Sequence, residues 1–378
     1  MKKGIIIGAG IGGLTTAIAL QKKGIDFDVY EQASALNEVG AGIWIAPNGL
    51  KVFQKLDIEK AIIKNGHFLK KIFVVDTNNK IVSKIDSEKL SQKHKFETLS
   101  IHRATLQQSL ATYIPKDNIK FNKKFKFFRQ AENGVEVFFE DGTVTEGDFL
   151  ISSDGVKSNV RSQINSNICL RYSGQTCWRF ITEYDLNEPD NMYEIWANEK
   201  GLRAGYTKIN SKQVYVFITN YEKEGGKDNT QSLKSNLLRL CKNFQPIVLD
   251  LIKSVDETKI IRTDLFDFKP IKKWVDKRVA LLGDAAHATT PNLGQGASQA
   301  IEDAYVIAEE LGSRLELHDS LKSYETKRIK KATYITNTSW LLSSITNRTG
   351  FAKFLLKNIM RATPEFISNK QLDRIYSI

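Results

Sequence analysis

Cysteine and histidine are scarce in this sequence. Its 378 residues include three cysteines, Cys169, Cys177 and Cys241, which form no CxxC pair and leave one thiol unmatched. The five histidines are dispersed, and there is no HExxH motif or cluster of His, Asp and Glu ligands. A disulfide framework and a zinc site are therefore not indicated, no metal is expected, and a reducing, cytoplasmic setting fits best.

Long apolar runs are also missing. No segment approaches 18 uninterrupted apolar residues, so stable membrane insertion is not expected. Lys2 and Lys3 precede an apolar stretch that ends at Ala17-Ile18-Ala19 and imitates a secretory signal. The glycine spacing inside this stretch argues instead for a folded element.

Dense clusters of basic residues are rare, although the net charge is +12. Most Lys and Arg residues occur as scattered pairs such as Lys22-Lys23 and Lys272-Lys273, and only the run 327–331 is dense. A nucleic-acid surface needs clustered basic side chains. Nucleic-acid binding is therefore not expected, and the partners should be small molecules.

A glycine-rich loop lies close to the N-terminus. Gly4–Ile7 predicts a short buried strand, and the apolar pattern of Ile11–Lys23 predicts a helix. Between them, Gly8 would allow a tight turn, Gly10 the close approach of a pyrophosphate, and Gly13 close packing of helix on strand. The positive end of the helix would then face the phosphates.

An acidic residue strengthens this motif. Asp28–Glu31 predicts the end of a second strand, and Glu31 follows Gly13 by 18 residues. A carboxylate there can bind ribose hydroxyls and would repel a 2′-phosphate. The tightly held dinucleotide is therefore expected to be FAD or NAD rather than NADP.

Two further motifs follow later in the chain. Asp148–Gly155 predicts a buried strand that runs into an Asp-Gly loop. Arg278–His287 predicts a strand that ends in Gly-Asp, and Pro291–Gly296 leads through a glycine-rich turn into another helix.

Together the three motifs resemble the class A flavoprotein monooxygenases, the family of para-hydroxybenzoate and salicylate hydroxylases. The resemblance covers nearly the whole chain. It implies that the first motif holds the ADP half of FAD, that the Asp-Gly loop serves FAD and the nicotinamide, and that the Gly-Asp aspartate binds the ribityl chain. These roles fall on Gly8, Gly10, Gly13 and Glu31, on Asp154 and Gly155, and on Gly283 and Asp284.

The resemblance also implies roles for three other segments. Arg103 stands at a helix start that meets the FAD phosphate or ribityl region, and Gly42 lies in the stretch 40–43, after Glu38, that runs beneath the flavin. The turn before the late helix would direct backbone N–H groups to the flavin edge, where negative charge gathers on reduction; it contains Pro291, Gly294, Gln295 and Gly296. His287 is expected to support this loop rather than to act as a base.

The implied reaction is that of an FAD-dependent monooxygenase. It would consume NADH or NADPH, which visits transiently, and O2, and hydroxylate a small aromatic, purine or polycyclic substrate through a flavin C4a-hydroperoxide. Two alternatives stay open at this point. One is a flavin-dependent dehydrogenase or reductase without oxygen insertion, and the other is a non-catalytic flavin-binding sensor.

The substrate side is expected where strand-like alternation with aromatic residues begins, after residue 171. Period-two spacing places Arg203 with Gly205 on one face of a strand, and Tyr215 with Phe217 on one face of another strand. An anionic planar substrate could be clamped by Arg203 and contacted by Tyr215. The FAD-dependent urate hydroxylases resemble this arrangement. They carry an aspartate where this sequence has Asn292, which leaves a general aromatic or polycyclic substrate at least as well supported.

The fold class predicted is α/β with α+β elements: a Rossmann-like FAD-binding domain, a discontinuous mixed-sheet substrate domain and C-terminal helices, in a monomer or homodimer. The expected ranges are 1–70, 100–171 and 262–335 for the FAD domain, 71–99 and 172–261 for the sheet domain, and 336–378 for the helices.

The C-terminal segment has an amphipathic pattern. Its apolar residues include Phe351, Phe354 and Ile359, interleaved with Lys353 and Lys357. It could lie on a membrane surface or close over its own domain interface, and the short elements favour the second interpretation.

Overall fold

A six-stranded sheet carries the three glycine and acid motifs. The computed structural model describes residues 2–36, 41–187 and 189–378, so Glu38 and Gly40 lie outside the described residues. The strand order is β18 (Val275–Asp276), β19 (Val279–Leu281), β12 (Phe149–Ser152), β1 (Lys3–Ile7), β2 (Asp26–Tyr30) and β8 (Ile119–Lys120). All pairings are parallel except that of β18 with β19. The strands that precede the three motifs, β1, β12 and β19, are therefore neighbours.

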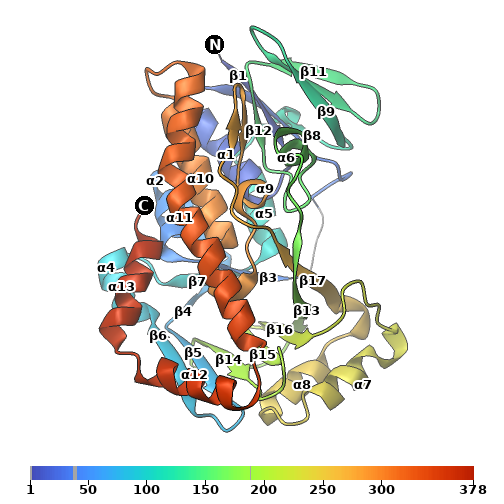
Figure 1. The fold of residues 1–378 in the computed structure, drawn as a ribbon, viewed down its shortest axis with the longest axis vertical. Coiled ribbons are helices and arrows are strands. Elements are labelled where there is room, and N and C mark those ends of the chain that lie inside the picture. The colour runs from blue at the N-terminus through green and yellow to red at the C-terminus, as the bar shows by residue number, and fades with distance from the viewer. Residues whose placement is uncertain (1, 37–40, 188) are drawn as a thin grey trace.

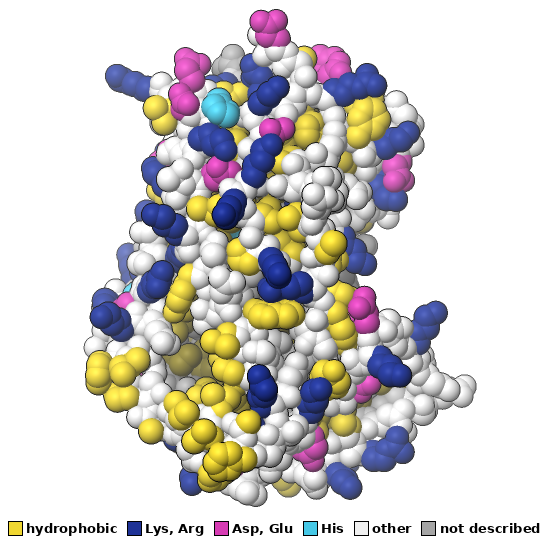
Figure 2. All heavy atoms as spheres, in the orientation of Figure 1, with side chains coloured by type: hydrophobic (Ala, Val, Ile, Leu, Met, Phe, Trp, Pro, Cys, Tyr) yellow, Lys and Arg dark blue, Asp and Glu magenta, His cyan; other side chains and the backbone are white. Residues whose placement is uncertain are grey.

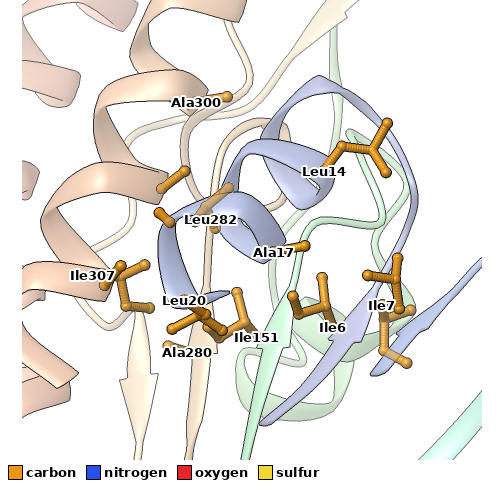
Figure 3. Close-up of a cluster of buried hydrophobic side chains, with 14 of the residues drawn as sticks. Ile6, Ile7, Leu14, Ala17, Leu20, Ile151, Ala280, Leu282, Ala300 and Ile307 are labelled. Carbon is orange, nitrogen blue, oxygen red and sulfur yellow. The ribbon is translucent and has the colours of Figure 1, made fainter. Parts of the chain in front are cut away.

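Two helices cover one face of this sheet. In Figure 3, Leu14, Ala17 and Leu20 of α1 (Ile11–Lys22) lie against the strands, beside Ala300 and Ile307 of α10 (Gly296–Leu311). The same buried cluster includes Ile6, Ile7, Ile151 and Ala280 of the strands and Leu282 just after β19, all fully or nearly fully buried. A parallel sheet covered by helices explains why these strands read as continuous apolar runs.

A seven-stranded sheet forms the other half of the molecule, at the lower end of Figure 1. Its order is β17 (Ile261–Asp267), β13 (Arg171–Glu183), β16 (Gln213–Tyr221), β15 (Arg203–Lys208), β14 (Asn191–Trp196), β5 (Lys71–Asp76) and β6 (Ile81–Asp86). Only β14 and β5 pair in parallel. A hydrophobic cluster shared with α7 (Thr230–Leu240) and α8 (Pro246–Ser254) covers one face. The sheet runs past residue 261 to Asp267, and the proposed division into domains stays a prediction.

Two smaller sheets and several short helices complete the fold. One three-stranded sheet has the order β3 (Gly42–Ile45), β7 (Thr98–His102) and β4 (Gly66–Leu69), and another has β11 (Val144–Gly147), β10 (Val135–Phe139) and β9 (Phe125–Gln130). The short helices are α2 (Pro47–Lys55), α3 (Glu59–Lys64), α4 (Ser87–His94), α5 (Arg103–Ala111), α6 (Asn159–Ile164) and α9 (Asp284–His287). The predicted mixed α/β fold is confirmed.

The chain ends in three helices. The long α11 (Leu317–Thr346) runs from the six-stranded sheet to the seven-stranded one, and α12 (Gly350–Ala362) and α13 (Glu365–Tyr376) follow it (Figure 1). Within the described part of the chain, no helix is long and apolar enough to cross a membrane. The expectation that the apolar side of α12 closes over its own domain was wrong, because Phe351 and Phe354 are exposed while Lys353 and Lys357 are buried.

Candidate active site

Two adjoining cavities meet at the ends of β1 and β12. The first, here called the loop cavity, has a volume of about 690 Å³ and is lined by the glycine loop, Glu31 and the Asp154 loop. The second, the wall cavity, has a volume of about 400 Å³ and reaches from the glycine loop to the seven-stranded sheet. Gly10, Arg103, Ser153 and Gly155 line both cavities. An extended ligand can therefore occupy the two cavities together.

The glycine loop is shaped by steric limits. Gly8 has a φ of +100°, and a Cβ on Gly13 would lie 1.9 Å from the carbonyl oxygen of Gly8, so neither position accommodates a side chain. Gly10 differs, because a Cβ there would meet no protein atom within 4 Å. The space beside Gly10 opens into both cavities. This is the cradle that the pyrophosphate of a dinucleotide such as FAD requires.

Glu31 ties the end of β2 to the same loop. Its Oε2 atom accepts a hydrogen bond from the backbone N–H of Ala9 at 2.8 Å, and its Oε1 atom accepts one from Ala33 at 2.9 Å. The carboxylate borders the loop cavity. Its expected contact with the ribose hydroxyls stays a prediction.

Arg103 and the Asp-Gly loop lie where the two cavities join. Asp154 accepts hydrogen bonds from the Ser152 hydroxyl at 2.5 Å and from the backbone N–H of Asn159 at 3.0 Å, which fixes the loop before α6. Gly155 has a φ of +83° and no protein atom near an added Cβ. Arg103 begins α5, and its side chain lines both cavities.

The loop after β19 supplies the next part of the wall cavity. Gly283 and Gly294 adopt positive φ values of 60° and 59°. Asp284 is exposed to the wall cavity, and protein atoms surround the rest of its side chain. These surroundings raise the pKa of Asp284 by desolvation, against the lowering effect of His287, Arg103 and Arg161.

His287 supports this loop from behind. It is 4% exposed, and its Nε2 atom lies 2.5 Å from Oδ2 of Asp303, the same oxygen that accepts the backbone N–H of Gly283 at 3.0 Å. Arg328 donates to the other Asp303 oxygen at 2.6 Å. Burial alone would raise the pKa of Asp303, but His287 and Arg328 hold it well below its usual range. His287 does not line the wall cavity, which agrees with a supporting role.

The seven-stranded sheet presents a row of side chains to the wall cavity from β13 to β16: Cys177, Arg179, Glu194, Arg203, Tyr215, Phe217 and Thr219. Arg203 is 3% exposed. Its Nη1 atom donates to Oε1 of Glu194 at 2.8 Å, and its Nε atom donates to the Thr219 hydroxyl at 3.2 Å. The predicted arginine is thus paired within the wall itself.

Tyr215 meets the stretch that carries Gly42. A Cβ on Gly42 would lie 2.3 Å from the Tyr215 ring, so glycine is required for this contact. Burial raises the pKa of Tyr215, although Arg179 beside it lowers it. The phenol is therefore neutral at physiological pH.

Sequence reasoning missed several residues of the wall cavity. Glu194 and Arg179 lie on strands that were recognised, but the register that brings them beside Arg203 and Tyr215 was not readable. Trp44 also lines the cavity, and its buried Nε1 atom has no hydrogen-bond partner within the described residues. Its position directly after the stretch at Gly42 was the available signal.

Asn292 has a similar unpaired atom. Its Nδ2 atom donates to the Thr290 hydroxyl at 2.9 Å and to the Ser339 carbonyl at 3.1 Å, while its buried Oδ1 atom lacks a partner among the described residues. All predicted site residues except Gly13 line one of the two cavities. Their individual roles stay predictions.

Residues 2–339 match the family described as FAD binding domain. The chain belongs to this family. The FAD that this family binds suits the paired cavities, because Gly10 and Gly155 leave room for it and Gly8 and Gly13 shape the turn beneath it.

Similar proteins agree on the type of enzyme. Aurachin C monooxygenase/isomerase of Stigmatella aurantiaca is 35% identical over 368 residues, 96% of this chain and 95% of the relative. An FAD-dependent urate hydroxylase of Klebsiella pneumoniae is 32% identical over 329 residues, 86% of this chain and 85% of the relative. The crystal structure of Klebsiella pneumoniae HpxO with FAD and uric acid matches with a TM-score of 0.91 and 29% identity, covering 99% of this chain and 96% of that one. The protein is an FAD-dependent monooxygenase.

Proposed function

We propose that this FAD-dependent monooxygenase hydroxylates a neutral, planar heteroaromatic or polycyclic compound, with NADH or NADPH as its transient electron donor. The observation that carries the proposal is the ion pair between Arg203 and Glu194, both of which line the wall cavity. An arginine whose charge is already matched gains less from an anionic substrate than an unpaired one does.

The remaining polar groups of the wall cavity also suit a neutral substrate. Asn292 is uncharged, and Tyr215 is a neutral phenol because burial raises its pKa. The side chains of Asn292 and Trp44 also line the cavity without adding charge to it. A neutral compound therefore meets no unmatched charge on these residues.

The chain's contribution to the reaction is positioning and shielding. FAD held by the glycine loop, Arg103 and the Asp-Gly loop would supply the redox chemistry that passes electrons from the nicotinamide to O2, from which the inserted oxygen atom comes. Trp44 and Phe217, whose rings lie 6.2 Å apart, form an apolar part of the wall that excludes water. Arg179 lies beside Tyr215, so the phenol is held at the cavity surface.

Urate is the second candidate substrate. A urate hydroxylase is 32% identical over most of both chains, and Arg203 and Tyr215 line one cavity. The two candidates differ in charge, because urate is an anion at neutral pH, so a matched substrate series distinguishes them.

The test uses the purified FAD-loaded protein with urate and with neutral fused-ring heteroaromatic compounds. NADH and NADPH oxidation, oxygen uptake and product mass are followed together. We expect a product heavier by one oxygen atom with a neutral compound and little turnover of urate. Fast conversion of urate would overturn the neutral-substrate proposal, and nicotinamide oxidation without any oxygenated product would favour a reductase.

A further inference from the structure

Helix α12 is packed with its charged side inward. Lys353 and Lys357 are 2% and 6% exposed. The Lys353 ammonium donates to the carbonyl oxygen of Glu199 at 2.8 Å, and that of Lys357 donates to the carbonyl of Trp196 at 3.3 Å and to Asn198 Oδ1 at 3.2 Å. Burying ammonium groups is costly unless they are hydrogen-bonded, and these bonds fix which side of the helix faces the protein.

The opposite side of α12 exposes large apolar side chains. Seven of the twelve exposed large hydrophobic side chains among the described residues fall between Leu341 and Ile367. They are Leu341, Phe351, Phe354, Leu355, Ile359, Phe366 and Ile367, here called the C-terminal apolar patch. Figure 2 shows hydrophobic side chains gathered over α12 and α13 at the lower left. A contiguous exposed patch of this kind marks an interaction surface.

The charge around the patch is positive. Residues 340–378 contain six Lys or Arg and two Asp or Glu. Lys353 and Lys357 are buried and Arg361 pairs with Asp76, so the exposed positive charge comes from Arg348, Lys370 and Arg374. Arg348, just before α12, and Lys370 on α13 are both exposed. Of the two acids, Glu365 pairs with Lys89 and Asp373 with Lys93, so both are neutralised.

We propose that the C-terminal apolar patch docks the enzyme onto the surface of an anionic lipid membrane. Aromatic and aliphatic side chains would enter the headgroup boundary while the basic rim meets the lipid charge. A second copy fits less well, because a twofold interface would place the same positive rim against itself.

The first experiment is co-sedimentation of the full-length FAD-loaded protein with lipid vesicles. One set contains phosphatidylcholine alone, and the other contains phosphatidylcholine with phosphatidylglycerol. We expect binding to the phosphatidylglycerol vesicles that weakens as NaCl rises to about 0.5 M, since salt screens the charge component. Absence of binding to the anionic vesicles would overturn the proposal.

The second experiment separates the patch from general apolar exposure. The double variant Phe351→Ser with Phe354→Ser should weaken vesicle binding about tenfold or more. The matched control is Leu315→Ser, because Leu315 is 46% exposed but lies just before α11, whose rise separates it from Leu341, the first residue of the patch along the chain, by roughly 36 Å. The control should bind vesicles like the unchanged protein.

Two further readouts keep this test decisive. FAD content and melting temperature should be equal in all three proteins, which shows that the patch variant is folded. Sedimentation analysis without lipid tests the second-copy alternative. A dimer that disappears in the double variant, or vesicle binding that the variant retains in full, would contradict lipid docking.

Discussion

The wall cavity has two sides that are built in different ways. On the side of the six-stranded sheet, Gly10, Gly155 and Gly283 line the cavity, so backbone forms much of the surface there. On the side of the seven-stranded sheet, the surface consists of side chains such as Glu194, Arg203 and Tyr215, which contact one another across strands.

This difference corresponds to two kinds of recognition. Backbone N–H groups at turns and helix starts suit a phosphate or a flavin edge, whose chemistry is the same in every member of such a family. Side chains paired across strands can change one at a time, so we expect them to determine which substrate is accepted. The predictions below test whether the two sides are separable in this way.

The largest effect is expected from Gly13→Ala. The added Cβ would lie 1.9 Å from the Gly8 carbonyl oxygen, a backbone atom that has no room to move because Gly8 itself abuts the Ser153 backbone. We expect the free energy of unfolding to fall by about 3 kcal/mol and little FAD to copurify. The flavin-to-protein ratio and thermal unfolding measure both. Full FAD loading at an unchanged melting temperature would show that the loop tolerates a side chain there.

Asp303→Asn tests whether side chains also matter on the cofactor side. Asp303 holds Gly283, His287 and Arg328 together, and an amide in its place keeps the shape but loses the charge-assisted hydrogen bonds, which should cost roughly 2 kcal/mol at pH 7. Because the folded-state pKa of Asp303 is depressed, its stabilising contribution is present above the unfolded value near 4 and is lost as pH falls below it.

Urea unfolding of both proteins from pH 7 to pH 3 measures this effect. The difference in unfolding free energy between the original protein and Asp303→Asn should be largest at pH 7 and should shrink below about pH 4. A difference that stays constant across this range would mean that the carboxylate charge does not stabilise the loop.

Gly10→Ala is the matched counterpart of Gly13→Ala. No protein atom lies within 4 Å of the added Cβ, so the unfolding free energy of the FAD-free protein should change by less than about 0.5 kcal/mol. FAD should nevertheless bind about tenfold more weakly, equivalent to about 1.4 kcal/mol, because the methyl group enters the space that both cavities share. Unchanged FAD affinity in a titration would mean that the dinucleotide does not pass Gly10.

The cofactor side could be predicted from the sequence because its requirements are local. Gly8, Gly10 and Gly13 stand at fixed spacing within one strand, turn and helix, and each later motif also ends a strand. The structure adds only that β1, β12 and β19 are neighbours, which brings motifs from distant parts of the chain to one edge. The mixed α/β fold followed from the same pattern.

The sheet side could be predicted less well, for a physical reason. Alternation in the sequence shows that Arg203 faces the same way as Gly205, but it does not reveal that Glu194 on β14 pairs opposite Gly205. Register between strands depends on tertiary contacts. The prediction of which side of α12 faces the protein was wrong for a related reason. Lys353 and Lys357 donate to carbonyl and amide oxygens just after β14, and no local sequence pattern indicates these contacts.

The smallest effect, and the most direct test of the sheet side, is expected from Glu194→Gln. The amide can still accept the Arg203 hydrogen bond, so folding should lose only about 1 kcal/mol, but the arginine becomes an unmatched positive charge. Binding of urate should strengthen about threefold to tenfold, while neutral heteroaromatic compounds change little. Glu183→Gln, at the exposed end of β13, removes the same charge away from the cavity and serves as the control. If both variants shift urate binding equally, the effect belongs to the overall field of the protein, and the Arg203–Glu194 pair does not set substrate charge.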